Sequence, residues 1–115
     1  MIAYNADSGS LMGTLGLYPK KQNIAPNTNR SIWDWDASTF NGVIPEASET
    51  YNVVGNVNEY GLIIGETTFG GLPQLNGHGT GAVMDYGSLI WVTLQRAKTA
   101  REAIKMMVRV HCKLS

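Results

Sequence analysis

The 115-residue sequence is poor in the two residue types that most often bind metals and form crosslinks. It has one cysteine, Cys112, and two histidines. A single cysteine excludes an internal disulfide framework and a cysteine-rich zinc site. His78 and His111 have no partner at a spacing typical of metal ligands. The sequence therefore predicts no metal site, and nothing in it indicates a cofactor.

Long apolar runs are also missing. No stretch approaches the ~18 apolar residues that a membrane-spanning helix needs, and no signal-peptide pattern is present. The sequence thus predicts no membrane partner and leaves the compartment open, with the cytoplasm as the favoured alternative. Hydrophobic residues still make up 43% of the chain, enough to bury a core. This argues against disorder and predicts a single domain over residues 1–115.

The charged residues are few and unevenly placed. Three basic residues stand against eight acidic ones over residues 1–94, whereas residues 95–115 have six basic residues and Glu102 alone. These two parts carry net charges of −5 and +5, and the whole chain is neutral. A basic tail can bind nucleic acid. Because no aromatic residue is interleaved with this tail and its pattern is helical, a solvated helix face is favoured and no nucleic-acid partner is predicted.

Strand patterns occupy much of residues 32–69. Residues 32–36 alternate apolar and acidic side chains, which predicts a half-buried strand with Trp33 and Trp35 on one face. Residues 40–44 form a second short predicted strand, ended by Pro45. The clearest pattern is a β-hairpin over residues 51–69. Its predicted turn is Asn58-Glu-Tyr-Gly61, in which Gly61 is free to take a positive φ.

Two helices are predicted near the C-terminus. Asp85 is a candidate N-cap for the first, whose apolar residues are Leu89, Ile90, Trp91, Leu94 and Ala97. Thr99-Ala-Arg-Glu102 has the spacing of a capping box. It predicts the start of a second helix, with Ala103, Ile104 and Met107 facing inward. Antiparallel strands followed by helices indicate an α+β fold.

Three other constellations have a chemical and a plain interpretation, and the plain one is favoured for each. Glu59 and Glu66 could form a glycosidase carboxylate pair, or be solvated carboxylates on a hairpin. Residues 77–81 are glycine-rich like a phosphate-binding loop, but no strand leads into them and no lysine follows, which favours a flexible loop. Cys112 is flanked by basic residues that could lower its thiol pKa, yet an incidental thiol is favoured.

Four segments resemble one enzyme family. Ala3-Tyr-Asn-Ala-Asp-Ser8 is similar to Ala-Arg-Asn/Thr-x-Asp-Ser, Val57-Asn-Glu-Tyr-Gly-Leu62 to x-Asn-Glu-x-Gly-Leu, and Gly65-Glu-Thr-Thr68 to Ser/Gly-Glu-Thr. Residues 84–103 resemble a helix pair with a Thr/Ser-Ala-Arg-Glu step. These motifs are typical of cysteine-dependent dipeptidases of the N-terminal-nucleophile (Ntn) hydrolase class, which are related to bile-salt hydrolases and penicillin V acylases.

This resemblance implies a fold, a reaction and three site residues. The fold would be part of an αββα sandwich, and the substrate a dipeptide or short peptide with a free amine. The nucleophile of the class is a cysteine at the start of the mature chain, whose α-amine is the general base. By resemblance, Asp7 orients that amine, and Thr68 occupies an oxyanion-hole position. Asn58 either braces the turn or donates a hydrogen bond.

Each of these three site residues also has a structural interpretation. Asp7 fits an Asx-turn or a strand-end cap. Thr68 fits an ordinary strand threonine, and for Asn58 turn geometry is the favoured explanation.

The sequence departs from the family pattern at two places. Tyr4 stands where the class has an arginine, and Cys112 lies far from the expected start of the mature chain. The first five residues read as a core strand, and residues 105–115 have no clear pattern, no stop signal and no following strand. We therefore expect an incomplete domain that lacks its nucleophile and is inactive alone. The alternatives are a non-catalytic fragment that binds peptides or partner chains, and a small basic-tailed interaction domain. Exposed strand edges leave a homo-oligomer open.

Overall fold

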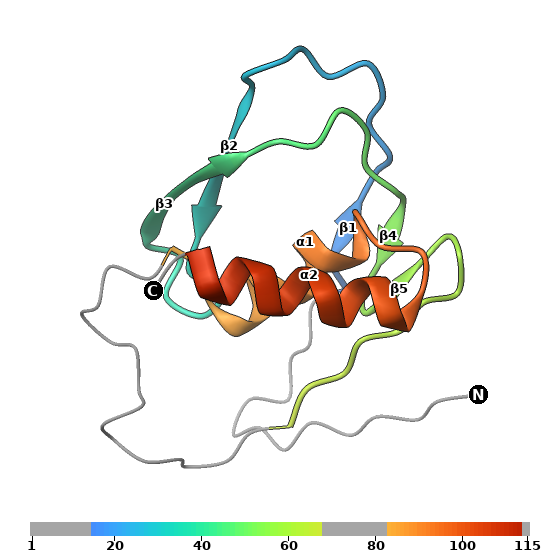
Figure 1. The fold of residues 1–115 in the computed structure, drawn as a ribbon. Coiled ribbons are helices and arrows are strands. Elements are labelled where there is room, and N and C mark those ends of the chain that lie inside the picture. Colours follow the sequence, from blue (N-terminus) through green and yellow to red (C-terminus); the bar gives the residue numbers. More distant parts are fainter. Residues whose placement is uncertain (1–14, 68–82, 114–115) are drawn as a thin grey trace.

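A computed structural model describes residues 15–67 and 83–113, with side chains up to Arg109. It contains two antiparallel sheets and two helices (Figure 1). The three-stranded sheet has the order β1 (Leu17–Tyr18), β4 (Val53–Val54), β5 (Val57–Asn58). The two-stranded sheet pairs β2 (Asn29–Trp33) with β3 (Phe40–Pro45), and the helices are α1 (Tyr86–Leu94) and α2 (Ala100–Lys113). The predicted α+β class is confirmed, and neither of these two helices is long and apolar enough to cross a membrane.

Helix α1 connects the two sheets. Ile90 and Leu94 belong to one buried cluster with Val53 of the three-stranded sheet. Val92, on another side of the helix, belongs to a second cluster with Ile32 and Ile44 of the two-stranded sheet. Six of the nine α1 residues are buried. A helix that is apolar on several sides can pack against more than one layer, so α1 fixes the two sheets relative to each other (Figure 1).

The hairpin predicted over residues 51–69 is built differently, because the chain reverses twice. A two-residue turn at Gly55, which has φ +54°, pairs β4 with β5. The second reversal is the predicted turn: Gly61 has φ +75°, and its N–H donates to the Asn58 carbonyl at 2.9 Å. Up to Thr67 the return limb forms no strand, only a bridge between Ile63 and Val57. Residues 68 and 69 lie outside the described part of the chain.

Strand β2 lies three residues earlier in the chain than predicted, at Asn29–Trp33 instead of residues 32–36. It ends at Trp33 because the Asp34 side chain accepts a hydrogen bond from the Asp36 N–H at 3.0 Å, which closes a turn. Trp33 and Trp35 therefore do not share a strand face. Trp35 instead lies against Gly87 of α1, where an added Cβ would come within 2.5 Å of the indole.

Both helices begin where the sequence predicts. Asp85 accepts a hydrogen bond from the Ser88 N–H at 2.9 Å, which caps α1. The capping box forms in both directions: Thr99 Oγ1 accepts from the Glu102 N–H at 3.3 Å, and Glu102 accepts from the Thr99 N–H at 3.1 Å. One side-chain prediction for α2 is wrong, since Ile104 is 63% exposed.

The rotation of α2 explains the exposure of Ile104. Ala103 is buried in the cluster of the three-stranded sheet, and Met106 packs against the same cluster. These two residues are three apart and define the inward side of the helix. Ile104 is a rotation of about 100° away from Ala103 and faces outward. Met107 is half-buried.

Replacing the capping threonine tests the α2 boundary. Thr99→Ala is expected to lower the free energy of unfolding by about 1 kcal/mol, because the first turn of α2 loses one of its N–H acceptors. Urea denaturation followed by circular dichroism measures the change. Thr39→Ala is the matched control, since Thr39 is exposed and outside any helix. Equal losses in the two variants would show that the cap contributes nothing.

Candidate functional site

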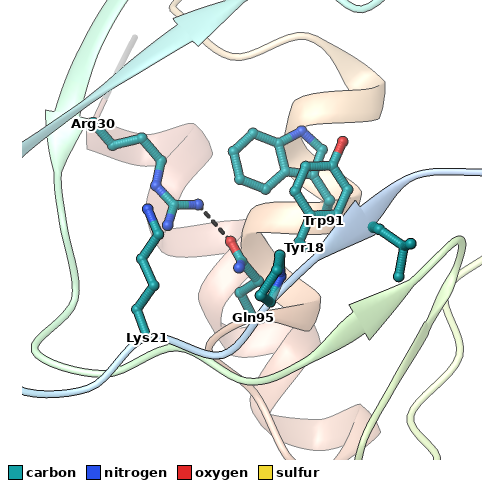
Figure 2. Close-up of a pocket in the computed structure, with 7 residues that line it drawn as sticks. Tyr18, Lys21, Arg30, Trp91 and Gln95 are labelled. Carbon is teal, nitrogen blue, oxygen red and sulfur yellow. Dashed lines mark hydrogen bonds between the residues drawn. The ribbon is translucent and has the colours of Figure 1, made fainter.

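A pocket of about 310 Å³ lies where β1, β2 and α1 meet (Figure 2). Strand β1 and the segment after it supply one wall, β2 supplies a cation, and α1 with its C-cap residue supplies an indole and an amide. Its lining residues are Leu17, Tyr18, Pro19, Lys21, Arg30, Trp91 and Gln95. In the view of Figure 2, Lys21 and Arg30 lie on one side of the pocket, and Tyr18 and Trp91 on the other.

The aromatic side of the pocket is an ordered stack. The rings of Tyr18 and Trp91 are nearly parallel, at 3°, with centroids 4.6 Å apart. The Arg30 guanidinium lies 4.9 Å from the Trp91 ring centroid, a favourable cation–π distance. Burial raises the pKa of the Tyr18 hydroxyl, although the charge of Arg30 opposes this. Tyr18 therefore stays neutral near pH 7.

The cationic side is held by a buried ionic network. Arg30 Nε donates to Glu46 at 2.5 Å, and Arg30 Nη1 donates to the Gln95 side-chain oxygen. Arg96 donates to the other Glu46 oxygen at 3.1 Å. The side chains of Glu46 and Arg30 are only 4% and 10% exposed. Two guanidinium groups thus share one carboxylate, and the network carries a net charge of +1.

The carboxylate of this network is ionised well into the acid range. Burial alone would raise the pKa of Glu46. Hydrogen bonds from Arg30, the Ala47 N–H and Arg96 oppose burial, and the net effect holds the pKa of Glu46 below its ordinary value. Arg30 is therefore fixed in place by a charged partner under physiological conditions.

Asn58 lies near the C-terminal end of α1 and braces it. Its side-chain amide donates to the carbonyls of Leu94 at 2.8 Å and Ala97 at 2.7 Å. Its side-chain oxygen accepts from the N–H groups of Tyr60 at 3.0 Å and Leu62 at 3.1 Å. Asn58 is 5% exposed, and all four of its hydrogen-bonding positions are used. Bracing is one of the two roles predicted for this residue. The catalytic role stays a prediction.

The other predicted site residues, Asp7 and Thr68, lie outside the described residues. Tyr4, His78 and the side chain of Cys112 do so too. Glu59 is described: it accepts from the Asn52 amide at 3.0 Å and lies 3.7 Å from the Lys20 ammonium. Within residues 15–67 and 83–109, no three His, Cys, Asp or Glu side chains are grouped closely enough to hold a metal ion.

The pocket residues were not predicted as a site. They come from three distant segments that only the packing of α1 between the sheets brings together. One local signal was present: Trp91 and Gln95 are four residues apart, so they share one side of a helix. That spacing shows a shared face but does not reveal which strand residues lie opposite it.

A family model described as peptidase family C69 matches residues 18–113. The chain belongs to peptidase family C69. This is a family of cysteine peptidases that includes dipeptidases, so the resemblance seen in the sequence is confirmed. Among the described residues, the matched range takes in both helices, four of the five strands and six of the seven pocket residues. Family C69 membership indicates a peptidase function and a peptide substrate. Neither the curated proteins nor the solved structures include a significant match.

Proposed function

We propose that this chain is part of a cysteine dipeptidase of the Ntn class, with the αββα sandwich of that class. The match to family C69 over residues 18–113 is the observation that carries the proposal. The turn at Asn58–Gly61 supports it, since the segment that resembles the family is tied to the end of α1 and the residues after it by two hydrogen bonds, and two more hold the turn itself. The proposed substrate is a dipeptide or a short peptide with a free amine.

The proposed reaction proceeds through an acyl-enzyme. The thiolate of an N-terminal cysteine attacks the carbonyl carbon of the scissile amide, and the α-amine of the same cysteine takes up the thiol proton. The proton then passes to the leaving amine as the tetrahedral intermediate collapses to a thioester, which water hydrolyses. Asp7 is proposed to hold the α-amine, and Thr68 to stabilise the oxyanion. Asn58 positions the turn that leads to Thr68.

Cys112 does not fit this role. It lies within α2, so its backbone nitrogen belongs to a peptide bond and has no basic lone pair. A cysteine in that position lacks the α-amine on which the mechanism depends. We therefore propose that the 115-residue polypeptide does not hydrolyse dipeptides by itself, and that the nucleophile comes from residues outside it.

Restoring the nucleophile tests the proposed function. A segment that begins with cysteine, taken from a C69 dipeptidase, is fused before residue 1, and the release of amino acids from dipeptides is measured. The fusion is expected to be active, and the 115-residue chain inactive. Asp7→Asn in the fusion is expected to lower kcat/KM by about 10²–10⁴-fold, because the α-amine loses its anionic partner. Circular dichroism should show an unchanged fold, since the substitution is nearly isosteric.

The same fusion tests the second candidate function, a non-catalytic fragment that binds peptides or partner chains. Tyr4 in place of the class arginine is the observation that favours this candidate. A folded fusion that shows no hydrolysis would support it and contradict the dipeptidase proposal. If the fusion is active and Asp7→Asn has no effect on its rate, the dipeptidase proposal stands and Asp7 is only a turn residue.

A further inference from the structure

We propose that the pocket between β1, β2 and α1 binds the C-terminal carboxylate of a short peptide whose last residue has an apolar side chain. The choice of a peptide as the ligand rests on the proposed function. The anionic and apolar parts of the ligand follow from the pocket itself, whose residues were not among the predicted catalytic ones.

The charge of the pocket calls for an anion. Its lining includes Lys21 and Arg30 and no acidic residue. The Glu46 carboxylate behind Arg30 pairs with the guanidinium groups of both Arg30 and Arg96. A net positive charge therefore remains there. In the described part of the chain, no acidic side chain forms an ion pair with Lys21. An incoming carboxylate therefore meets two cations on the pocket wall, and the carboxylate nearest to Arg30, that of Glu46, is already shared by two guanidinium groups.

Arg30 keeps hydrogen-bond donors for such a ligand. A guanidinium has five N–H groups. Glu46 accepts from Nε and pairs with Nη2, and Gln95 accepts from Nη1, which leaves two N–H groups. The contacts with Glu46, Gln95 and the Trp91 ring also fix the orientation of the guanidinium. A ligand oxygen then binds without the cost of ordering this side chain.

The remaining wall suits one apolar side chain. Leu17 is 67% exposed at the pocket, and Pro19 and the stacked Tyr18 and Trp91 continue the apolar surface. A volume of about 310 Å³ is at the lower end of ligand-binding cavities. It has room for one terminal residue and its carboxylate, so the rest of a peptide would lie outside the pocket. A dipeptide ending in leucine meets these requirements.

Binding is measured with the 115-residue chain, which is expected to leave a dipeptide intact. The probes for isothermal titration calorimetry are Ala-Leu and its C-terminal amide. The amide is expected to bind at least about 10-fold more weakly, because it loses charge-assisted hydrogen bonds. Equal affinities for the two probes, or no binding of Ala-Leu at millimolar concentration, would overturn the proposal.

Two adjacent lysines provide a matched pair of variants. Lys21→Gln is expected to weaken Ala-Leu binding about 5- to 10-fold, since it removes one of the two cations of the pocket. Lys20→Gln is the control, because the Lys20 ammonium lies 3.7 Å from Glu59 and does not line the pocket. Equal effects of the two substitutions would show only a general charge effect and would contradict the assignment.

Two further probes identify the source of the carboxylate. N-acetylleucine is expected to bind about as well as Ala-Leu, because only the terminal residue occupies the pocket. Inorganic phosphate is expected to bind more weakly, since it makes no contact with the apolar wall. Phosphate affinity equal to that of N-acetylleucine would show a general anion site and overturn the proposal for peptides.

Failure of this proposal is distinguishable from failure of the proposed function. If the fusion hydrolyses dipeptides but the 115-residue chain binds Ala-Leu and its amide equally, the dipeptidase proposal stands. The proposal that the pocket recognises the substrate carboxylate then fails. If the 115-residue chain binds Ala-Leu more tightly than its amide but the fusion is inactive, the proposed peptide-binding pocket stands. The catalytic proposal then fails.

Discussion

Asn58→Asp is expected to destabilise the domain by about 3–5 kcal/mol, the usual cost of an uncompensated buried charge. The substitution puts a carboxylate oxygen where the amide now donates to the carbonyls of Leu94 and Ala97. Three oxygens would then face one another in a site that is 5% exposed. Urea denaturation, followed by circular dichroism at neutral pH, measures the loss as a fall in the midpoint.

The control for this prediction is Asn56→Asp, in the neighbouring turn. Asn56 is exposed, and its amide donates one hydrogen bond, to the Ile64 carbonyl at 2.7 Å. Its replacement is expected to cost about 1 kcal/mol or less, since water can solvate the new charge. If the two aspartates destabilised the domain equally, the brace between the turn and α1 would not exist in solution.

Glu46→Gln is the second substitution with a large expected effect. It removes the carboxylate that is paired with both Arg30 and Arg96 and leaves two largely buried guanidinium groups without an anion. Breaking a buried ion pair from one side typically costs about 3–5 kcal/mol. Arg30 also orders the Trp91 side of the pocket, so Trp fluorescence is expected to change together with the free energy of unfolding.

The pH dependence of stability gives an independent test of Glu46. Its pKa in the folded state lies below the ordinary value, so the ionised group stabilises the fold above that value. This contribution is lost as the pH falls through the lower, folded-state pKa. Thermal unfolding between pH 7 and pH 3 is expected to show a steeper loss for the wild type than for Glu46→Gln.

Glu49→Gln serves as the control for both measurements, because Glu49 is exposed and lies outside the Arg30–Glu46–Arg96 network. It is expected to change the free energy of unfolding by about 0.5 kcal/mol or less. A Glu46 variant as stable as the Glu49 variant, with the same pH dependence as the wild type, would contradict the network.

Local features of the fold were predictable from the sequence. The caps at Asp85 and Thr99 and the turn that ends at Gly61 depend on residues within four positions of one another. Their geometry follows from side-chain chemistry and backbone freedom alone. The positive φ of Gly61 is one such consequence.

Features that depend on packing were not predictable in this way. Gly55-Asn56 stands between Val54 and Val57, so the alternation of residues 51–57 is compatible with one continuous strand as well as with a two-residue turn. Ile104 fits an inward position by hydrophobicity, and only the seating of Ala103 against the core decides which side of α2 faces out. Likewise, nothing in the sequence around Asn58 indicates that its side chain donates to the carbonyls of Leu94 and Ala97.

The same limit applies to the pocket. Each of its main residues has an ordinary local explanation: Arg30 is an arginine on a strand, Lys21 a surface lysine and Trp91 an aromatic residue on a helix. Their shared location appears only after β1, β2 and α1 are packed together. The predicted catalytic residues came instead from family resemblance, and two of those three, Asp7 and Thr68, are in segments that the structure does not describe.

The amide of Asn58 also has a consequence for the order of folding events. Its two donated bonds reach carbonyls 36 and 39 residues further along the chain. Loops of this length must close before those bonds form, and closure of long loops slows the search for the native state. The turn at residues 58–61 can begin as a local structure, but it is locked only once α1 has docked. Completion of the three-stranded sheet and capture of the end of α1 are therefore expected to occur in one late, cooperative step.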